Sequence, residues 1–237
     1  MDQRAFTKLC KENGFKLKRD APAQVYYRLW EGALFQVISI YRQPGIRPQV
    51  YLGCYSMYWE IFIRAAKGLS LPFGRFSVSE YAAMKRLPAP SSLEEDFAFA
   101  ENRLIPYLNN LRSQRDLIRA EAEFSAVYPL QANWNTNLCG AFLYEKEDQA
   151  ALLRISKVLA QNIEAVIWSL RSSGQYDQDQ ALADSFRRWV QRRETLLEGY
   201  RVALSNIPNL REDFLNKQQQ MNLRDLRELE APAKQHK

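Results

Sequence analysis

The chain of 237 residues contains only one histidine, His236, next to the last residue. A histidine that acts as a general base has to be held in place by a third group, whereas the ends of a chain are usually frayed. The scarcity of histidine therefore argues against Ser-His-Asp or Cys-His catalysis and against zinc sites built with histidine. We predict no catalytic residues, no metal and no cofactor, and keep a histidine-free enzyme that uses Asp/Glu, Tyr or Lys as an alternative.

Cysteine and phosphate-binding loops are also scarce or missing. Cys10, Cys54 and Cys139 are odd in number and far apart, which fits neither a disulfide framework nor a C-x-x-C metal site. We expect them to be buried free thiols. The chain has no G-x-x-x-x-G-K-[ST] loop and no G-x-G-x-x-G loop after a strand, which excludes phosphate binding of those two kinds.

Long hydrophobic runs are absent. The longest uncharged apolar run, residues 32–41, is far shorter than the roughly 20 residues that a membrane-spanning helix needs. The N-terminal stretch MDQRAFTKLCKENG carries charges where a signal peptide has an apolar segment. We therefore expect a cytoplasmic protein without a membrane partner.

The composition that remains is that of an ordinary globular protein, with 46% hydrophobic and 25% charged residues. The formal charge of +6 arises from 33 basic and 27 acidic residues. A positive charge of this size permits contact with nucleic acid but does not require it.

The N-terminal part predicts a helix followed by antiparallel strands. A helical stripe over residues 2–13 ends at Asn13-Gly14, and the basic stretch KLKRDAPA then connects it to the first strand. The strands lie in QVYYRLWEGALFQVISIYRQ (24–43) and in QVYLGCYSMYW (49–59), with a fourth in residues 59–63 or 74–87. The expected sheet is an antiparallel meander of three to five strands.

The C-terminal part, beyond the stretch LPAPSS (87–92), predicts helices almost to the end of the chain. Ser92 and Glu95 fit a capping box, and Pro106 is expected to begin a new helical segment. Further apolar stripes cover 147–170, 178–205 and 210–229. The predicted fold is α+β, with a sheet region in residues 1–90 and a helical region in 91–237 that can share one core with it.

Five short motifs follow one another along the chain: KENGF (11–15), YYR (26–28), LFQVISIYRQ (34–43), LGCY (52–55) and LIPYL (104–108). In this order they resemble the DUF4304-like family, a group of uncharacterised bacterial domains, and the resemblance covers residues 1–165. This resemblance implies a fold and a bacterial context, in which some members are discussed as immunity proteins, but it implies no reaction. Members often carry a cysteine- and arginine-containing strand where this chain has EYAAMKRL (80–87), so no shared site is implied there.

The hairpin is the main candidate for a binding surface. A two-residue turn at Glu31-Gly32 would pair Trp30 with Ala33 and would leave hydrophobic side chains on both faces of the hairpin. Helices of the same chain can cover both faces, which would make the hairpin a core element. The alternative is an aromatic face partly open to a protein partner, a composition typical of binding hot spots. The residues of that face are Tyr26, Arg28, Trp30 and Phe35.

The basic run FRRWVQRRE (186–194) is the alternative candidate, for nucleic acid. Its tryptophan shares a helical stripe with Phe186 and Leu196, which favours a core position for the ring and a solvated face for the arginines. The residues available for phosphate contacts are Arg187, Arg188, Arg192 and Arg193.

The acidic groups favour structural roles. Glu94, Glu95 and Asp96 precede or begin a helix, where the helix dipole favours negative charge, and the same holds for Asp177 and Asp179.

Taken together, the sequence patterns predict a non-enzymatic protein-binding module with an immunity-like or adaptor role. Nucleic-acid association and a histidine-free enzyme remain the alternatives.

Overall fold

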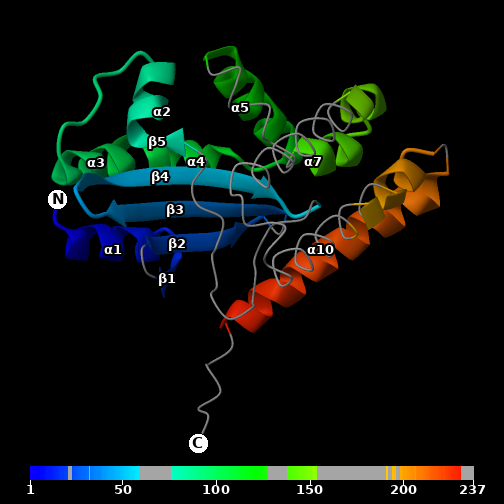
Figure 1. Ribbon diagram of the computed structural model, residues 1–237, viewed down its shortest axis with the longest axis horizontal. Helices are drawn as coiled ribbons and strands as arrows, with labels where there is room; N and C mark the ends of the chain where they lie inside the picture. Colours follow the sequence, from blue (N-terminus) through cyan, green and yellow to red (C-terminus); the bar gives the residue numbers. More distant parts are fainter. Residues whose placement is uncertain are drawn as a thin grey trace, which may run out of the picture.

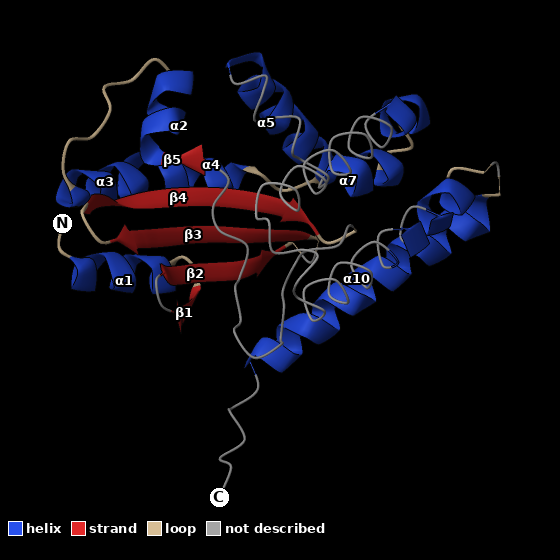
Figure 2. Ribbon diagram, viewed as in Figure 1, coloured by secondary structure: helices blue, strands red, loops and turns tan. Residues whose placement is uncertain are grey.

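The computed structural model describes residues 1–20, 23–31, 33–58, 76–127, 138–153, 191, 194–195, 198–205 and 207–230. It has the predicted α+β architecture, in which an N-terminal helix and an antiparallel sheet precede a helical C-terminal half (Figures 1 and 2). The elements in chain order are α1 (Gln3–Glu12), β1 (Lys16–Asp20), β2 (Ala23–Trp30), β3 (Leu34–Gln43), β4 (Ile46–Ser56), β5 (Phe76–Ser77), α2 (Val78–Met84), α3 (Leu93–Phe99), η1 (Ala100–Leu104), α4 (Ile105–Asn110), α5 (Gln114–Val127), α7 (Leu138–Tyr144) and α10 (Pro208–Glu230).

Helix α1 begins and ends where the sequence predicts. The carboxylate of Asp2 accepts a hydrogen bond from the N–H of Ala5 and caps the first turn. At the other end Gly14 adopts a φ of 79°, a left-handed conformation that favours glycine, and turns the chain back. Phe15 then packs into the core beneath the helix.

The sheet has five strands in the order β1-β2-β3-β4-β5, each antiparallel to its neighbours. The interpretation of residues 16–20 as a connection was wrong, because Lys16 to Asp20 form the edge strand β1. Lysines protect an exposed sheet edge from pairing with another chain. In β1 they also make the alternation of polar and apolar residues, by which a half-buried strand is recognised, hard to see in the sequence. The later of the two predicted positions for a further strand holds β5, whereas residues 59–63 lie outside the described part of the chain.

The predicted register of the hairpin was wrong by one residue. Trp30 pairs with Leu34, so the connection between β2 and β3 has three residues and Ala33 belongs to the turn. The carbonyl of Ala33 accepts hydrogen bonds from the N–H of Met57 (2.9 Å) and the side chain of Gln114 (3.0 Å), which hold the longer turn in place. Because side chains alternate along a strand, this slip moves Phe35 to the face opposite Arg28.

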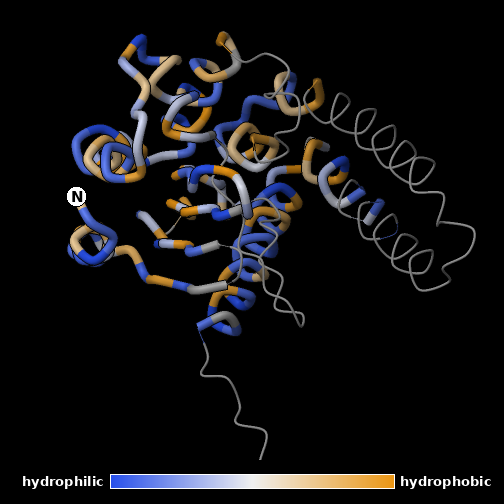
Figure 3. Tube along the Cα trace, turned by 60° about the vertical axis from the view of Figure 1, so that its left-hand side comes forward, coloured by the Kyte–Doolittle hydropathy of each residue, from blue (hydrophilic) through white to orange (hydrophobic). Residues whose placement is uncertain are grey.

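Each face of the sheet has its own helical cover (Figures 1 and 3). Tyr26, Ile38 and Leu52 lie on one face and pack against α1 and the segment from α3 to α5 in a cluster that also contains Phe6 and Phe97. This cluster joins residues from both of the predicted regions. The opposite face packs against α10 through Val25, Tyr27, Phe35, Val37, Met57 and Leu226.

The segment from α3 to α4 is one continuous helical run, and its last helix, α4, begins at Ile105 with Pro106 in its first turn, as predicted. Ser92 caps its start by accepting from the N–H of Glu95, while the Glu95 carboxylate accepts from the N–H and the hydroxyl of Ser91. A π-helical turn, η1, lies just before Pro106. Such a turn shifts the backbone pairing and accommodates a proline that has no N–H to donate.

Helix α10 is anchored to the sheet at its C-terminal half. The buried side chain of Asn222 donates to the carbonyl of Met57 (2.8 Å), and Glu230 pairs with Lys16 of the edge strand at 2.7 Å. Burial raises the pKa of Tyr27 to about 12, helped by its hydrogen bond to Glu230. These contacts fix the direction in which the N-terminal half of α10 leaves the sheet.

Arg28 is buried, with 4% of its surface exposed, and links three parts of the fold. Its guanidinium donates to the carbonyl of Asn13 (2.6 Å), to Gln36 Oε1 (2.8 Å) and to Asn109 Oδ1 (2.6 Å). The rings of Phe15 and Trp30 lie 4.3 and 3.9 Å from its central carbon. Burial lowers the pKa of Arg28 to about 10, so the group still carries its charge at neutral pH.

Replacing Arg28 by methionine should lower the free energy of unfolding by about 2–4 kcal/mol, because Asn13, Gln36 and Asn109 lose the donor to their buried acceptors. Urea unfolding of Arg28→Met, with the exposed Arg4→Met in α1 as the matched control, measures the effect. A loss as small as that of the control would show that the link contributes little to stability.

Candidate functional site

The predicted aromatic binding face is not formed. Tyr26, Arg28 and Phe35 are buried, and Phe35 lies on the other side of the sheet. The hydroxyl of Tyr26 is 2.8 Å from Thr7 Oγ1 of α1, so this helix covers the position that was expected to be open. Trp30 is partly buried and stacks on Arg28. In the isolated chain the hairpin is therefore a core element that helices of the same chain cover.

The other candidate residues either lie outside the described part of the chain or have structural roles. Arg187, Arg188, Arg192 and Arg193 lie outside the described residues, as do Asp177 and Asp179. Asp96 is buried and pairs with Arg47 at 2.7 Å, and Glu95 closes the start of α3. Within the described part of the chain, no group of His, Cys, Asp and Glu side chains is arranged to hold a metal ion.

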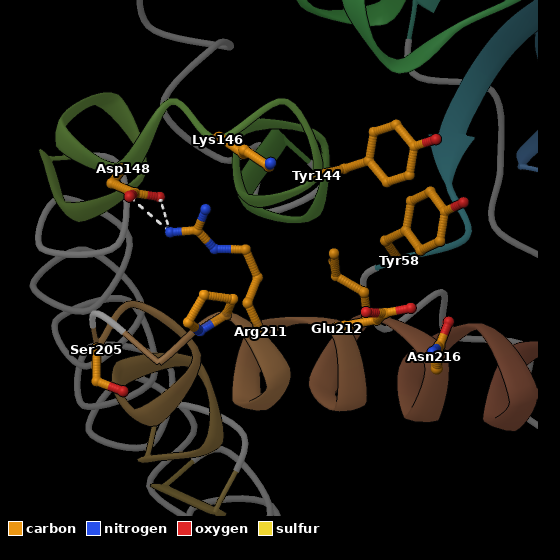
Figure 4. A pocket seen from close by; sticks show the side chains of 10 residues that line it. Tyr58, Tyr144, Lys146, Asp148, Ser205, Arg211, Glu212 and Asn216 are labelled. Atoms are coloured by element: carbon orange, nitrogen blue, oxygen red, sulfur yellow. Dashed lines mark hydrogen bonds and ion pairs between the residues drawn. The ribbon is translucent and has the colours of Figure 1, made fainter.

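A cleft lies between the C-terminal end of α7 and the first turns of α10 (Figure 4). Its volume is about 530 Å³. The α7 side contributes Tyr144, Lys146 and Asp148, the α10 side Arg211 and Glu212. The rest of the lining comes from Tyr58, which follows β4, and from Ser205, Pro208, Leu215 and Asn216.

Arg211 and Asp148 connect the two walls of the cleft. One guanidinium nitrogen, Nη2, donates to both carboxylate oxygens of Asp148 at 2.6 Å. The Nε of Arg211 is buried and has no hydrogen-bond partner among the described residues. Because the Asp148 charge is paired within the protein, it offers little attraction to a bound cation.

Lys146 reaches the cleft from a constrained backbone position. It adopts a φ of 62° directly after α7, and the N–H of Glu147 donates to the carbonyl of Phe142 (2.9 Å), which is the bond pattern of a helix end that favours glycine. Its side chain is exposed and makes no ion pair with any described residue. A lysine therefore occupies a position where glycine would cost less.

Two tyrosines form the end of the cleft that lies nearest the sheet. The rings of Tyr58 and Tyr144 stack with centroids 4.5 Å apart and an angle of 13° between their planes. Burial, with the neighbouring Tyr144, raises the pKa of Tyr58 to about 12. The side-chain hydrogen bond to Tyr144 also favours the protonated phenol, so the Tyr58 hydroxyl is already engaged within the aromatic pair.

Sequence reasoning missed this cleft because its walls come from distant parts of the chain. Asp148 and Arg211 are 63 residues apart, and no local motif connects them. The available signal was Lys146 in the stretch YEKED after the apolar stripe of α7, a helix end without the expected glycine.

Comparisons with protein-family models, curated proteins and solved structures found no match to this chain. The resemblance to the DUF4304-like family accordingly stays a prediction. Among the described residues no helix combines the length and the apolar character that crossing a membrane requires.

Replacing Lys146 by glycine should raise the free energy of unfolding by about 0.5–1 kcal/mol, because relief of the left-handed conformation outweighs the greater freedom of glycine in the unfolded chain. Arg86, with a φ of 55° after α2, is the matched position. Urea unfolding of Lys146→Gly and Arg86→Gly should show gains of similar size. A loss of stability in Lys146→Gly alone would mean that the Lys146 side chain supports the fold.

Proposed function

We propose that this protein is a non-enzymatic binding protein whose ligand occupies the cleft between α7 and α10. The cleft itself supports this proposal most directly, because its volume of about 530 Å³ falls in the usual range of small-ligand sites. Its lining combines the exposed charges of Lys146 and Glu212 with the flat surface of Tyr144 and the hydrophobic side chain of Leu215. Mixed linings of this kind give a ligand both contact area and orientation.

The chemistry of the lining favours binding over catalysis. Asp148 is engaged by Arg211, so it is poorly placed to accept a proton from a substrate. The raised pKa of Tyr58 makes its phenol a weak acid that stays protonated at neutral pH. Neither Asp148 nor Tyr58 is therefore prepared to act as the base or nucleophile that a histidine-free enzyme would need.

A protein partner remains compatible with this proposal. A side chain or chain end presented by another protein has the dimensions of a small ligand and can enter a cleft that opens to solvent. The proposal therefore keeps the predicted binding role and moves its location from the hairpin to the α7–α10 cleft. Nucleic-acid binding by the arginine segment stays a separate prediction.

Filling the cleft should abolish binding. In a screen of small metabolites by thermal unfolding, a ligand at about 100 times its Kd should raise the Tm of the wild type by about 5–10 °C. Asn216→Trp places an indole in the cleft and should remove this shift. Gln220→Trp, an exposed position one turn further along α10, is the matched control and should keep it.

The same two variants, Asn216→Trp and Gln220→Trp, test whether a protein partner binds in the cleft. A partner retained by the tagged wild type and by Gln220→Trp, but lost from Asn216→Trp, would place its contact in the cleft. A ligand or partner that binds all three forms equally would contradict the proposal, and so would the failure of both searches to find any.

A further inference from the structure

We infer that the cleft binds a zwitterionic small molecule of the amino-acid class with a hydrophobic or aromatic side chain. This inference rests on the proposed function and names the ligand class of the same site. In this arrangement Lys146 binds the ligand carboxylate, Glu212 binds its ammonium group, and the tyrosine pair with Leu215 contacts the side chain.

The charges of the cleft point to a ligand that carries both signs. Asp148 and Arg211 neutralise each other by their ion pair. Lys146 and Glu212 are exposed and make no ion pair, either with each other or with any other residue in the described part of the chain. An anion alone would meet the repulsion of Glu212, and a cation alone that of Lys146, whereas a zwitterion satisfies both.

The two unpaired charges lie on opposite walls. Lys146 follows α7, while Glu212 is in the second turn of α10, and Figure 4 shows them on the two sides of the space between these helices. A ligand that bridges them has to present its carboxylate and its ammonium group to different walls. An α-amino acid carries a carboxylate, an ammonium group and a side chain, one group for each part of the lining.

The remaining surface is suited to a hydrophobic side chain. Tyr144 is 46% exposed although its ring stacks on Tyr58, so part of the aromatic pair is open to a ligand. Leu215 adds a buried aliphatic surface from α10. Stacking on an exposed aromatic pair favours flat and apolar groups.

The test compares ligands that differ only in charge. L-phenylalanine carries both charged groups, 3-phenylpropionate lacks the ammonium group, and 2-phenylethylamine lacks the carboxylate. We expect isothermal calorimetry to show that each analogue binds wild-type protein about five- to tenfold more weakly than L-phenylalanine, the effect of losing one partly exposed charge-assisted contact. L-leucine and L-tryptophan test whether the side-chain site accepts both aliphatic and aromatic groups.

Two variants assign each charge to its wall. Lys146→Gly should weaken L-phenylalanine and 3-phenylpropionate about five- to tenfold without weakening 2-phenylethylamine. Glu212→Gln should give the opposite pattern with the two analogues. The controls are Arg86→Gly, which changes the same backbone conformation elsewhere, and Asp213→Asn, which removes the neighbouring exposed carboxylate of α10.

The outcomes separate this inference from the proposed function. The zwitterion assignment would be overturned by analogues that bind as well as L-phenylalanine, or by variants that weaken the binding of all ligands equally. It would also be overturned if none of the three amino acids bound at about 10 mM, well above a Kd of ~1 mM. The proposed function would survive each result if another ligand still lost its binding in Asn216→Trp. If the three ligands showed the expected order of affinities, and Asn216→Trp left these affinities unchanged, the cleft would not be the binding site.

Discussion

The buried guanidinium of Arg28 is the contact on which the arrangement of the sheet depends. It carries a charge in the core, and its described hydrogen-bond partners are neutral oxygens that come from three separate parts of the chain. An isolated buried charge is costly unless its donors are paired. Arg28 therefore requires the end of α1, strand β3 and helix α4 to be in place together, and this requirement closes one face of the hairpin.

The position of the cleft follows from that closed core. Since α1 and the α3–α5 segment cover one face of the sheet, α10 covers the other and is held there by Asn222 and Glu230. The first turns of α10 extend beyond the sheet and meet the end of α7, where Tyr200 and Phe214 contribute to a separate small core. At this junction charged side chains line a cleft in place of apolar packing: the ion pair of Arg211 with Asp148, and Lys146 and Glu212, which make no ion pair with any described residue.

The sequence predicts the helices and strands of this fold better than it predicts which residues of neighbouring strands pair. Helix α1 was predictable because Asp2 and Gly14 mark its ends, and the strands because their apolar residues alternate. The register was not, because Glu31-Gly32 is a weak turn signal and the contacts that stabilise a three-residue turn come from Met57 and Gln114. A one-residue slip was enough to misplace the candidate binding face.

The cleft could not be found in the same way, because nothing in the local sequence shows that residues from α7 and α10 meet. Hydrogen–deuterium exchange of the wild-type protein with and without L-phenylalanine tests the central claim, that the hairpin is core and the cleft is the binding site. The account predicts slower exchange in residues 138–153 and 207–216, with no change in 23–43. Slower exchange in the hairpin, with none at the cleft, would contradict it.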